Sequence, residues 1–341
     1  MIPTKPVLPV HGAGTDGLIV GFWFEAGRPS QPVDSLEQAA RWRAAGRPGF
    51  AWLHLQLGHA GTGPWIRQQT DLGEAFQESL DGGSRSTRIE RDGEMLFAVM
   101  NDLKFQFGYE ASDVSTLWIA VGPDRVISTR QQPLRSVDRL RQAVRRGEAI
   151  GSPVSLLDHL VRDQADELQA IVRQTAERVD DIEDALLAGR GDGQNLELTR
   201  LRRLMVRLMR WLALEPSALQ RTLASPPAWV PPQDMARLQR ASEEFALVLR
   251  DISALQERIK LMQDEVSARV AEDNNRSLFT LTMVTVLALP INLISGLFGM
   301  NVGGVPLSDH RAGFWIMVGV IGSLTSLIVW RVLRRLRGRN Y

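Results

Sequence analysis

The stretch from Ser277 to Ser308 reads SLFTLTMVTVLALPINLISGLFGMNVGGVPLS and contains no Asp, Glu, Lys, Arg or His. About 20 apolar residues are enough for a helix to cross a lipid bilayer. The sequence therefore predicts a transmembrane helix over residues 277–300. A second uncharged stretch runs from Ala312 to Trp330. It predicts a second transmembrane helix over 312–331, which makes a hairpin of two spans joined by a short loop over 301–311.

The basic tail sets the expected orientation of this hairpin. Arginines follow the second span at Arg331, Arg334, Arg335, Arg337 and Arg339. Basic residues that flank a span favour the cytoplasmic side. Two spans return the chain to the side on which it started. We therefore expect a multi-pass protein of the inner (plasma) membrane, with residues 1–276, the tail over 332–341 and both termini in the cytoplasm.

One stripe of residues along the first span differs from its apolar surroundings, because four of its seven members are polar. Polar groups that face lipid are costly, so we expect the stripe to turn inward. It could line a water-filled pore, or its side chains could hold helices together by hydrogen bonds. We favour the pore, which needs several copies of the chain because one stripe cannot enclose water. The predicted pore-lining residues are Asn275, Leu278, Thr282, Thr285, Leu289, Asn292 and Gly296.

The first span ends in Gly299-Met300-Asn301, within the string GMNVGGVP. In this position, behind a long soluble region and before a second span, the motif resembles that of the CorA-type divalent metal ion transporter family. The longer string is similar to that of the zinc-transport branch of the family, called ZntB. The resemblance implies a homopentamer, a selectivity motif of Gly299, Met300 and Asn301, and transport of Zn²⁺ coupled to a proton gradient. The residues themselves leave Mg²⁺, Co²⁺ and Ni²⁺ open.

Several residues near the spans are candidates for contact with a metal ion. Amide, hydroxyl and carbonyl oxygens suit divalent ions that give up their water reluctantly, and Asn301 offers such an oxygen without a full charge. Asp309 and His310 in the outer loop could attract cations or could be plain solvated residues. Neither span contains an ionisable residue before Arg331, the last residue of the second span. Proton handling would therefore fall to groups outside the spans. The tentative candidates at the inner end are Asp264, Glu265 and Glu257.

Residues 1–150 alternate strand-like and helix-like patterns. Short apolar runs over 17–24 and 50–57 predict strands. Turn sequences at Asp92-Gly93 and Gly122-Pro123-Asp124 predict two hairpins, and residues 64–80 have helical composition. We expect a cytoplasmic α/β domain with a mixed sheet, in which His54 and His59 are structural residues rather than metal ligands.

From residue 151 the pattern becomes wholly helical. A helical region over 151–232 is interrupted by glycines over 189–193 and by prolines from 226 onwards, with a second helix expected over about 196–214. Its acidic cluster over 180–184 could hold a regulatory cation. We favour a solvated helix face, because Arg173 and Arg178 are close enough to neutralise it.

No proline occurs between Pro232 and Pro290, so we expect a stalk helix over 233–276 that continues into the first span. Steps of three and four residues along the stalk are typical of a seam that packs against other helices. The seam consists of Phe245, Val248, Ile252, Leu255, Ile259, Met262 and Val266. The predicted fold is thus an α+β membrane protein, in which the α/β domain is followed by a long helical stalk and two transmembrane helices.

The composition argues against several classes of function. A net charge of +1 argues against a nucleic-acid partner, and the absence of cysteine excludes disulfides and thiolate metal sites. No phosphate-binding loop or catalytic set is present, so we expect neither an enzyme nor a prosthetic group. The expected partners are the lipid bilayer, divalent metal ions and further copies of the chain. A membrane-anchored cytoplasmic sensor or scaffold without transport stays open as an alternative.

Overall fold

The computed structural model describes residues 14, 16–69, 72–82, 87–106, 108, 113–188, 194–213, 215–300 and 311–337. The chain divides into two compact units, residues 1–263 and 264–341, which are described separately below. The first unit contains a sheet and helices α1 to α7 together with the first part of α8. The second contains the rest of α8 and α9.

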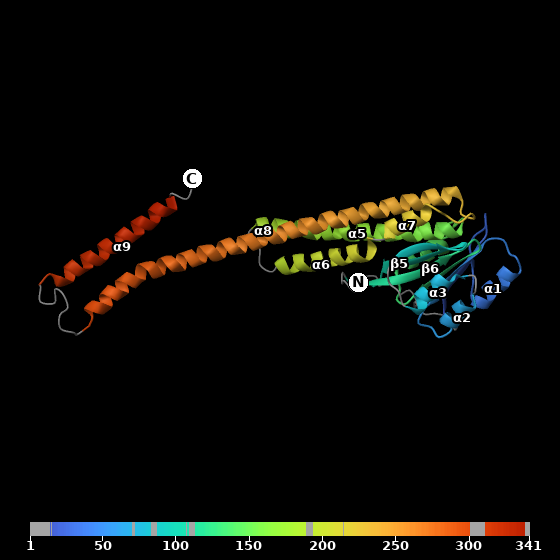
Figure 1. The fold of residues 1–341 in the computed structure, drawn as a ribbon, viewed down its shortest axis with the longest axis horizontal. Coiled ribbons are helices and arrows are strands. Elements are labelled where there is room, and N and C mark those ends of the chain that lie inside the picture. The colour runs from blue at the N-terminus through green and yellow to red at the C-terminus, as the bar shows by residue number, and fades with distance from the viewer. Residues whose placement is uncertain are drawn as a thin grey trace, which may run out of the picture. The chain divides into compact units, whose positions relative to one another are not determined.

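A seven-stranded mixed sheet forms the core of the first unit (Figure 1), in the order β2-β1-β3-β7-β6-β5-β4. Among the described strands, β3 and β7 pair in parallel and the other neighbours pair antiparallel. The predicted mixed sheet is confirmed, and the two predicted hairpins are the β4–β5 and β6–β7 pairs. The strands are β1 (Leu18–Phe24), β2 (Gln31–Pro32), β3 (Phe50–Gln56), β4 (Arg88–Asp92), β5 (Met95–Leu103), β6 (Val114–Val121) and β7 (Arg125–Arg130).

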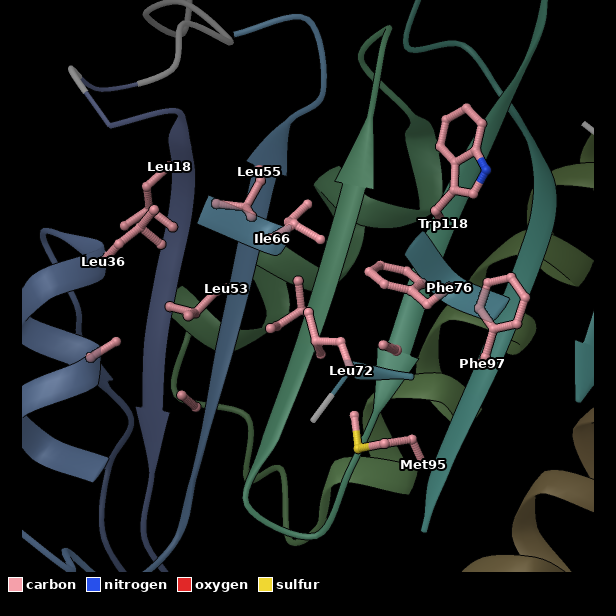
Figure 2. Packing of buried hydrophobic residues seen from close by; sticks show 14 of the residues in the cluster. Leu18, Leu36, Leu53, Leu55, Ile66, Leu72, Phe76, Met95, Phe97 and Trp118 are labelled. Carbon is pink, nitrogen blue, oxygen red and sulfur yellow. The ribbon is translucent and has the colours of Figure 1, made fainter. Parts of the chain in front are cut away.

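Three short helices pack on one face of this sheet: α1 (Leu36–Ala44), α2 (Thr62–Gln68) and α3 (Glu74–Asp81). Figure 2 shows the contact, in which Leu36, Ile66 and Phe76 of these helices meet strand residues such as Leu53 and Phe97. The Phe76 and Phe97 rings lie 5.6 Å apart in an edge-to-face arrangement. Each such side chain contributes roughly 1.5–3 kcal/mol when it is fully buried.

The expectation of helix over residues 64–80 is only partly correct, because α2 ends at Gln68 and α3 begins at Glu74. Gly73 precedes α3 with a φ of 79°, in the left-handed region that favours glycine. A Cβ atom at this position would lie 2.2 Å from Oδ2 of Asp92, on strand β4. A close approach from a remote strand therefore sets the break between the two helices.

The other face of the sheet carries polar groups that position α4 (Arg135–Arg145). The first residues of α4 have no local side-chain cap, and Oδ2 of Asp102 on β5 accepts instead from the backbone N–H of Ser136 (3.1 Å) and its hydroxyl (2.6 Å). Burial raises the pKa of Asp102 to about 6. On β3, His54 is buried on the same face, with Nδ1 2.8 Å from the Ser128 hydroxyl. Burial lowers its pKa, so it is a neutral structural residue.

Three long helices and one short one complete the first unit. The long ones are α5 (Pro153–Leu187), α6 (Gln194–Leu212) and the first part of α8 (Pro232–Phe298), and the short one is α7 (Glu215–Leu223). The sequence pattern did not indicate α7, and α6 ends two residues before the predicted boundary. The seam predicted for the stalk is confirmed. Its seven members are all buried, with at most 7% of each residue exposed.

Helix α8 continues through residue 264 into the second unit and reaches Phe298 without interruption. Its 67 residues would extend about 100 Å at 1.5 Å per residue. Pro290 lies inside it. The last helix is α9 (Gly313–Arg337). The predicted long helix and the two C-terminal apolar helices are therefore present.

An ion-pair network joins the end of α4 to α5. Nε2 of His159 lies 2.8 Å from Oε1 of Glu148, and Nδ1 lies 3.3 Å from Oδ2 of Asp163. The hydrogen bond to Asp163 is the main cause that raises the pKa of His159 from 6.5 to about 9, against the effect of burial. At neutral pH this histidine is therefore charged.

We expect His159 to make folding stability pH-dependent in the alkaline range. Its folded pKa lies above its unfolded value, so the stabilisation is fully present below about pH 6.5 and is lost as the pH rises through about 9. Thermal unfolding followed by circular dichroism should give a Tm difference between wild type and His159→Gln that is largest at pH 6 and shrinks toward pH 9.5. A difference that stays constant across this range would contradict the assignment.

Candidate functional site

The apolar part of α8 and helix α9 form the candidate site. Each is long and apolar enough to cross a membrane, and the share of the most apolar window that is buried is 0% in α8 and 6% in α9. A core helix of a soluble protein would be mostly buried. The apolar side chains of both helices therefore need lipid or another chain to cover them, as the exposed fractions of Leu281 (64%) and Trp315 (73%) illustrate.

The polar stripe predicted along the first span is exposed throughout. All seven of its residues are exposed in the part of the chain that the structure describes. Leu278 and Leu289 are exposed by 60% and 65%. Within the described residues, no side chain of the same chain covers the stripe, so any partner for it comes from elsewhere.

The threonine hydroxyls of α8 already donate to its backbone. Thr282 Oγ1 donates to the carbonyl of Leu278 (2.8 Å), and Thr285 Oγ1 donates to that of Leu281 (2.9 Å). Each hydroxyl proton is thereby satisfied inside the helix, while the oxygen lone pairs stay free to accept. On its exposed side the stripe therefore offers acceptors, which suit a cation or the hydrogens of its water shell.

The asparagine amides of the stripe differ from the threonines. Asn275 and Asn292 are exposed, and within the described residues neither side chain has a hydrogen-bond partner. An unpartnered amide in hydrocarbon costs several kcal/mol. Asn292 lies inside the predicted span and consequently needs water, an ion or a neighbouring helix, whereas Asn275 lies two residues before the span begins.

Helix α8 ends at the motif singled out by the sequence. The backbone N–H of Gly299 donates to the carbonyl of Ser295 (2.9 Å), and Met300 follows with 52% of its surface exposed. A Cβ atom built on Gly296 would meet nothing within 4 Å. The packing of the chain itself therefore does not require a glycine there. The candidates Asn301, Asp309 and His310 lie outside the described residues.

The candidates at the inner end do not form a metal site within one chain. Glu257 lies 3.7 Å from Nζ of Lys260, and Glu265 lies 2.5 Å from a guanidinium nitrogen of Arg269. Asp264 is exposed and has no ion pair among the described residues. Over the same residues, no group of three or more His, Asp or Glu side chains is arranged to hold a metal ion.

Two carboxylates of the acidic cluster over residues 180–184 pair with a residue that the sequence analysis did not identify. Arg258 of α8 lies 2.6 Å from Asp180 and also pairs with Glu183, both on α5. These two carboxylates, that of Glu183 foremost, raise the pKa of the Arg258 guanidinium. Because α8 supplies the arginine from far along the chain, no short-range spacing could have indicated this pairing.

The chain is similar to known transport proteins in both sequence and fold. A family model described as CorA-like Mg²⁺ transporter protein matches residues 48–335. The chain is 27% identical over 288 residues to the divalent cation transporter CmaX of Pseudomonas aeruginosa, covering 84% of this chain and 86% of the relative. It is 23% identical over 279 residues to the zinc transport protein ZntB of Yersinia enterocolitica, covering 82% and 85%. Its fold is similar to the full-length structure of CmaX, with a TM-score of 0.76 at 24% identity over 94% of this chain and 98% of that one.

Proposed function

The chain belongs to the family of CorA-like Mg²⁺ transporter proteins, and on this basis we propose that it carries divalent metal cations across a membrane. One observation carries the proposal: the apolar end of α8, uncharged from residue 277 onward, presents a stripe in which four of seven residues are polar, and the described chain leaves it uncovered. Acceptor oxygens without full charge hold a partly hydrated ion and still release it, as conduction requires. Gly299, Met300 and Asn301 would form the selective end of this path.

We propose that five copies of the chain enclose the path. One stripe cannot surround water, and the face of α8 away from its buried seam is also uncovered in the first unit. There Leu247 and Leu261 are exposed by 55% and 60%. Neighbouring copies would bury these leucines and bring the stripes together around one axis. The number five rests on family resemblance.

We propose Zn²⁺ as the transported ion, with Mg²⁺, Co²⁺ and Ni²⁺ as alternatives. The string GMNVGGVP supports zinc, together with the similarity to a protein named for zinc transport. The relative CmaX carries the broader name of divalent cation transporter. Proton coupling stays a prediction, and its candidate groups are Asp309 and His310, with Asp264, Glu265 and Glu257 on the other side.

In the proposed arrangement the chain crosses the plasma membrane twice, and its segments follow one another in sequence order. A cytoplasmic α/β domain (1–150) and a helical region (151–232) precede the stalk (233–276). The spans would cover 277–300 and 312–331, with the loop 301–311 outside and the tail 332–341 inside. The arginines of the tail support this orientation.

We expect Asn301→Ala to reduce metal flux by at least about tenfold, because it would remove the ring of amide carbonyls proposed at the outer mouth. The measurement is Zn²⁺ entry into liposomes that contain only this protein, read with a fluorescent indicator. Asn195→Ala, at an exposed position on α6, serves as the matched control and should transport like wild type. Wild-type flux in Asn301→Ala would refute the motif assignment. No flux from wild type for any of the four metals would favour the membrane-anchored sensor.

Cysteine substitution tests which face of the first span meets water, since the chain has no cysteine of its own. Cysteines at Asn275, Thr282, Thr285 and Asn292 should react with a charged, water-soluble thiol reagent in the reconstituted protein. Cysteines at Val284 and Leu287 are the controls and should stay unlabelled, because they lie off the stripe. Equal labelling of the two sets would remove the case for a water-lined stripe.

The assembly should have five times the chain mass of 38.0 kDa. Light scattering coupled to size exclusion, corrected for detergent, measures this directly. Leu247→Glu places a charge on the face that we expect neighbouring copies to cover, and it should lower the fraction of the large species. Lys260→Gln, at an exposed position about 140° round α8 from Leu247, should not. A stable wild-type monomer or dimer would contradict the enclosed path.

A further inference from the structure

A polar cleft in the first unit is separate from the candidate ion path. Its volume is about 400 Å³, within the range of small-molecule sites. One wall is the first turns of α5, the other is the first turns of α8, and residues 148–150 close one end. The charged lining residues are Glu148, Asp158, His159, Arg162, Arg237, Arg240 and Glu244.

Most charges on the α5 wall are already paired. His159 is positively charged at neutral pH and holds Glu148, with 2.8 Å between Nε2 and Oε1. Arg162 donates to Oδ2 of Asp158 at 2.7 Å. The α5 wall is therefore close to neutral and has little attraction for an ion by itself.

The α8 wall is different, because its guanidinium groups have no acidic partner. Among the described residues, Arg237 and Arg240 form no ion pair, and the Nε of Arg240 donates only to the carbonyl of Ala236 (3.3 Å). The two arginines are three positions apart and so share one face of α8. Two guanidiniums on one wall form the donor fork that recognises a phosphate group.

The cleft also offers acceptors beside these donors. Glu244 lies one turn beyond Arg240 and has no partner among the described residues. Asp158 is 7% exposed, and its Oδ1 lacks a hydrogen-bond partner. A bare anion would satisfy the arginines and would leave these carboxylates unmatched. A ligand with a hydroxyl group next to its phosphate would satisfy both.

We propose that this cleft binds a small phosphorylated solute that carries a hydroxyl donor. Arg237 and Arg240 would hold the phosphate, and Glu244 would accept from the hydroxyl. The groups involved lie outside the proposed ion path, so the cleft is a second site rather than part of the first. Its ligand would be recognised in the aqueous phase.

The test is isothermal titration calorimetry on the full chain in detergent and phosphate-free buffer, with glycerol 3-phosphate as the probe. We expect saturable binding, at least about fivefold tighter than that of inorganic phosphate, and no binding of glycerol. The double variant Arg237→Gln/Arg240→Gln should weaken glycerol 3-phosphate binding by at least about tenfold, since it removes two charge-assisted contacts. Arg250→Gln, outside the cleft, should bind like wild type.

A second variant isolates the acceptor. Glu244→Gln should reduce the preference for glycerol 3-phosphate over inorganic phosphate, because the amide is a weaker acceptor than the carboxylate. All substituted side chains are exposed, and circular dichroism will verify that the variants fold. Three results would overturn the proposal: no saturation by about 20 mM glycerol 3-phosphate, unchanged binding in the double variant, or equal affinity of wild type for the two phosphates. Because the readout is binding, it does not depend on whether the protein transports metal.

Discussion

A polar group inside hydrocarbon must find a hydrogen-bond partner or water. This constraint applies to the polar side chains along the apolar half of α8. Its threonines meet the constraint alone, by donating to the backbone one turn earlier. The amide of Asn292 has no such local solution. A single copy of the second unit therefore leaves this amide without a partner in a bilayer. In the proposed assembly, water between several copies would satisfy the amide and leave the threonine oxygens as acceptors along its path.

Helix α8 carries both an apolar seam and the polar stripe. The apolar seam ends at Val266 and the polar stripe begins at Asn275, nine residues later. At about 100° per residue the helix turns by roughly 900° between them, which puts the stripes on opposite sides. The seam is buried, whereas the apolar end of α8 is exposed on faces beside the stripe as well, as Val284 (59%) and Leu293 (63%) show. The nine-residue spacing along one helix therefore sets the phase between the two stripes.

Among the described residues of the first unit, some charged side chains form ion pairs and others have no acidic partner. Arg258 and His159 each lie between two carboxylates. The pairs of Arg258 are well exposed, so each contributes at most about 1 kcal/mol to stability. Each of these pairs also places a positive charge beside carboxylates that could otherwise attract a cation. Arg237 and Arg240 lack such partners and keep their charge available in a cleft.

Periodicity and turn residues in the sequence were enough to predict the two apolar helices, the long α8, its buried seam and the two hairpins. These features depend on residues three, four or two positions apart, whose geometry is local. Four other features came only from tertiary structure: the break between α2 and α3 at Gly73, the capping of α4 by Asp102, the pairing of Arg258 with Asp180, and the cleft between α5 and α8. Each joins residues from distant parts of the chain, and the sequence has no spacing rule for contacts that form only when separate elements pack together.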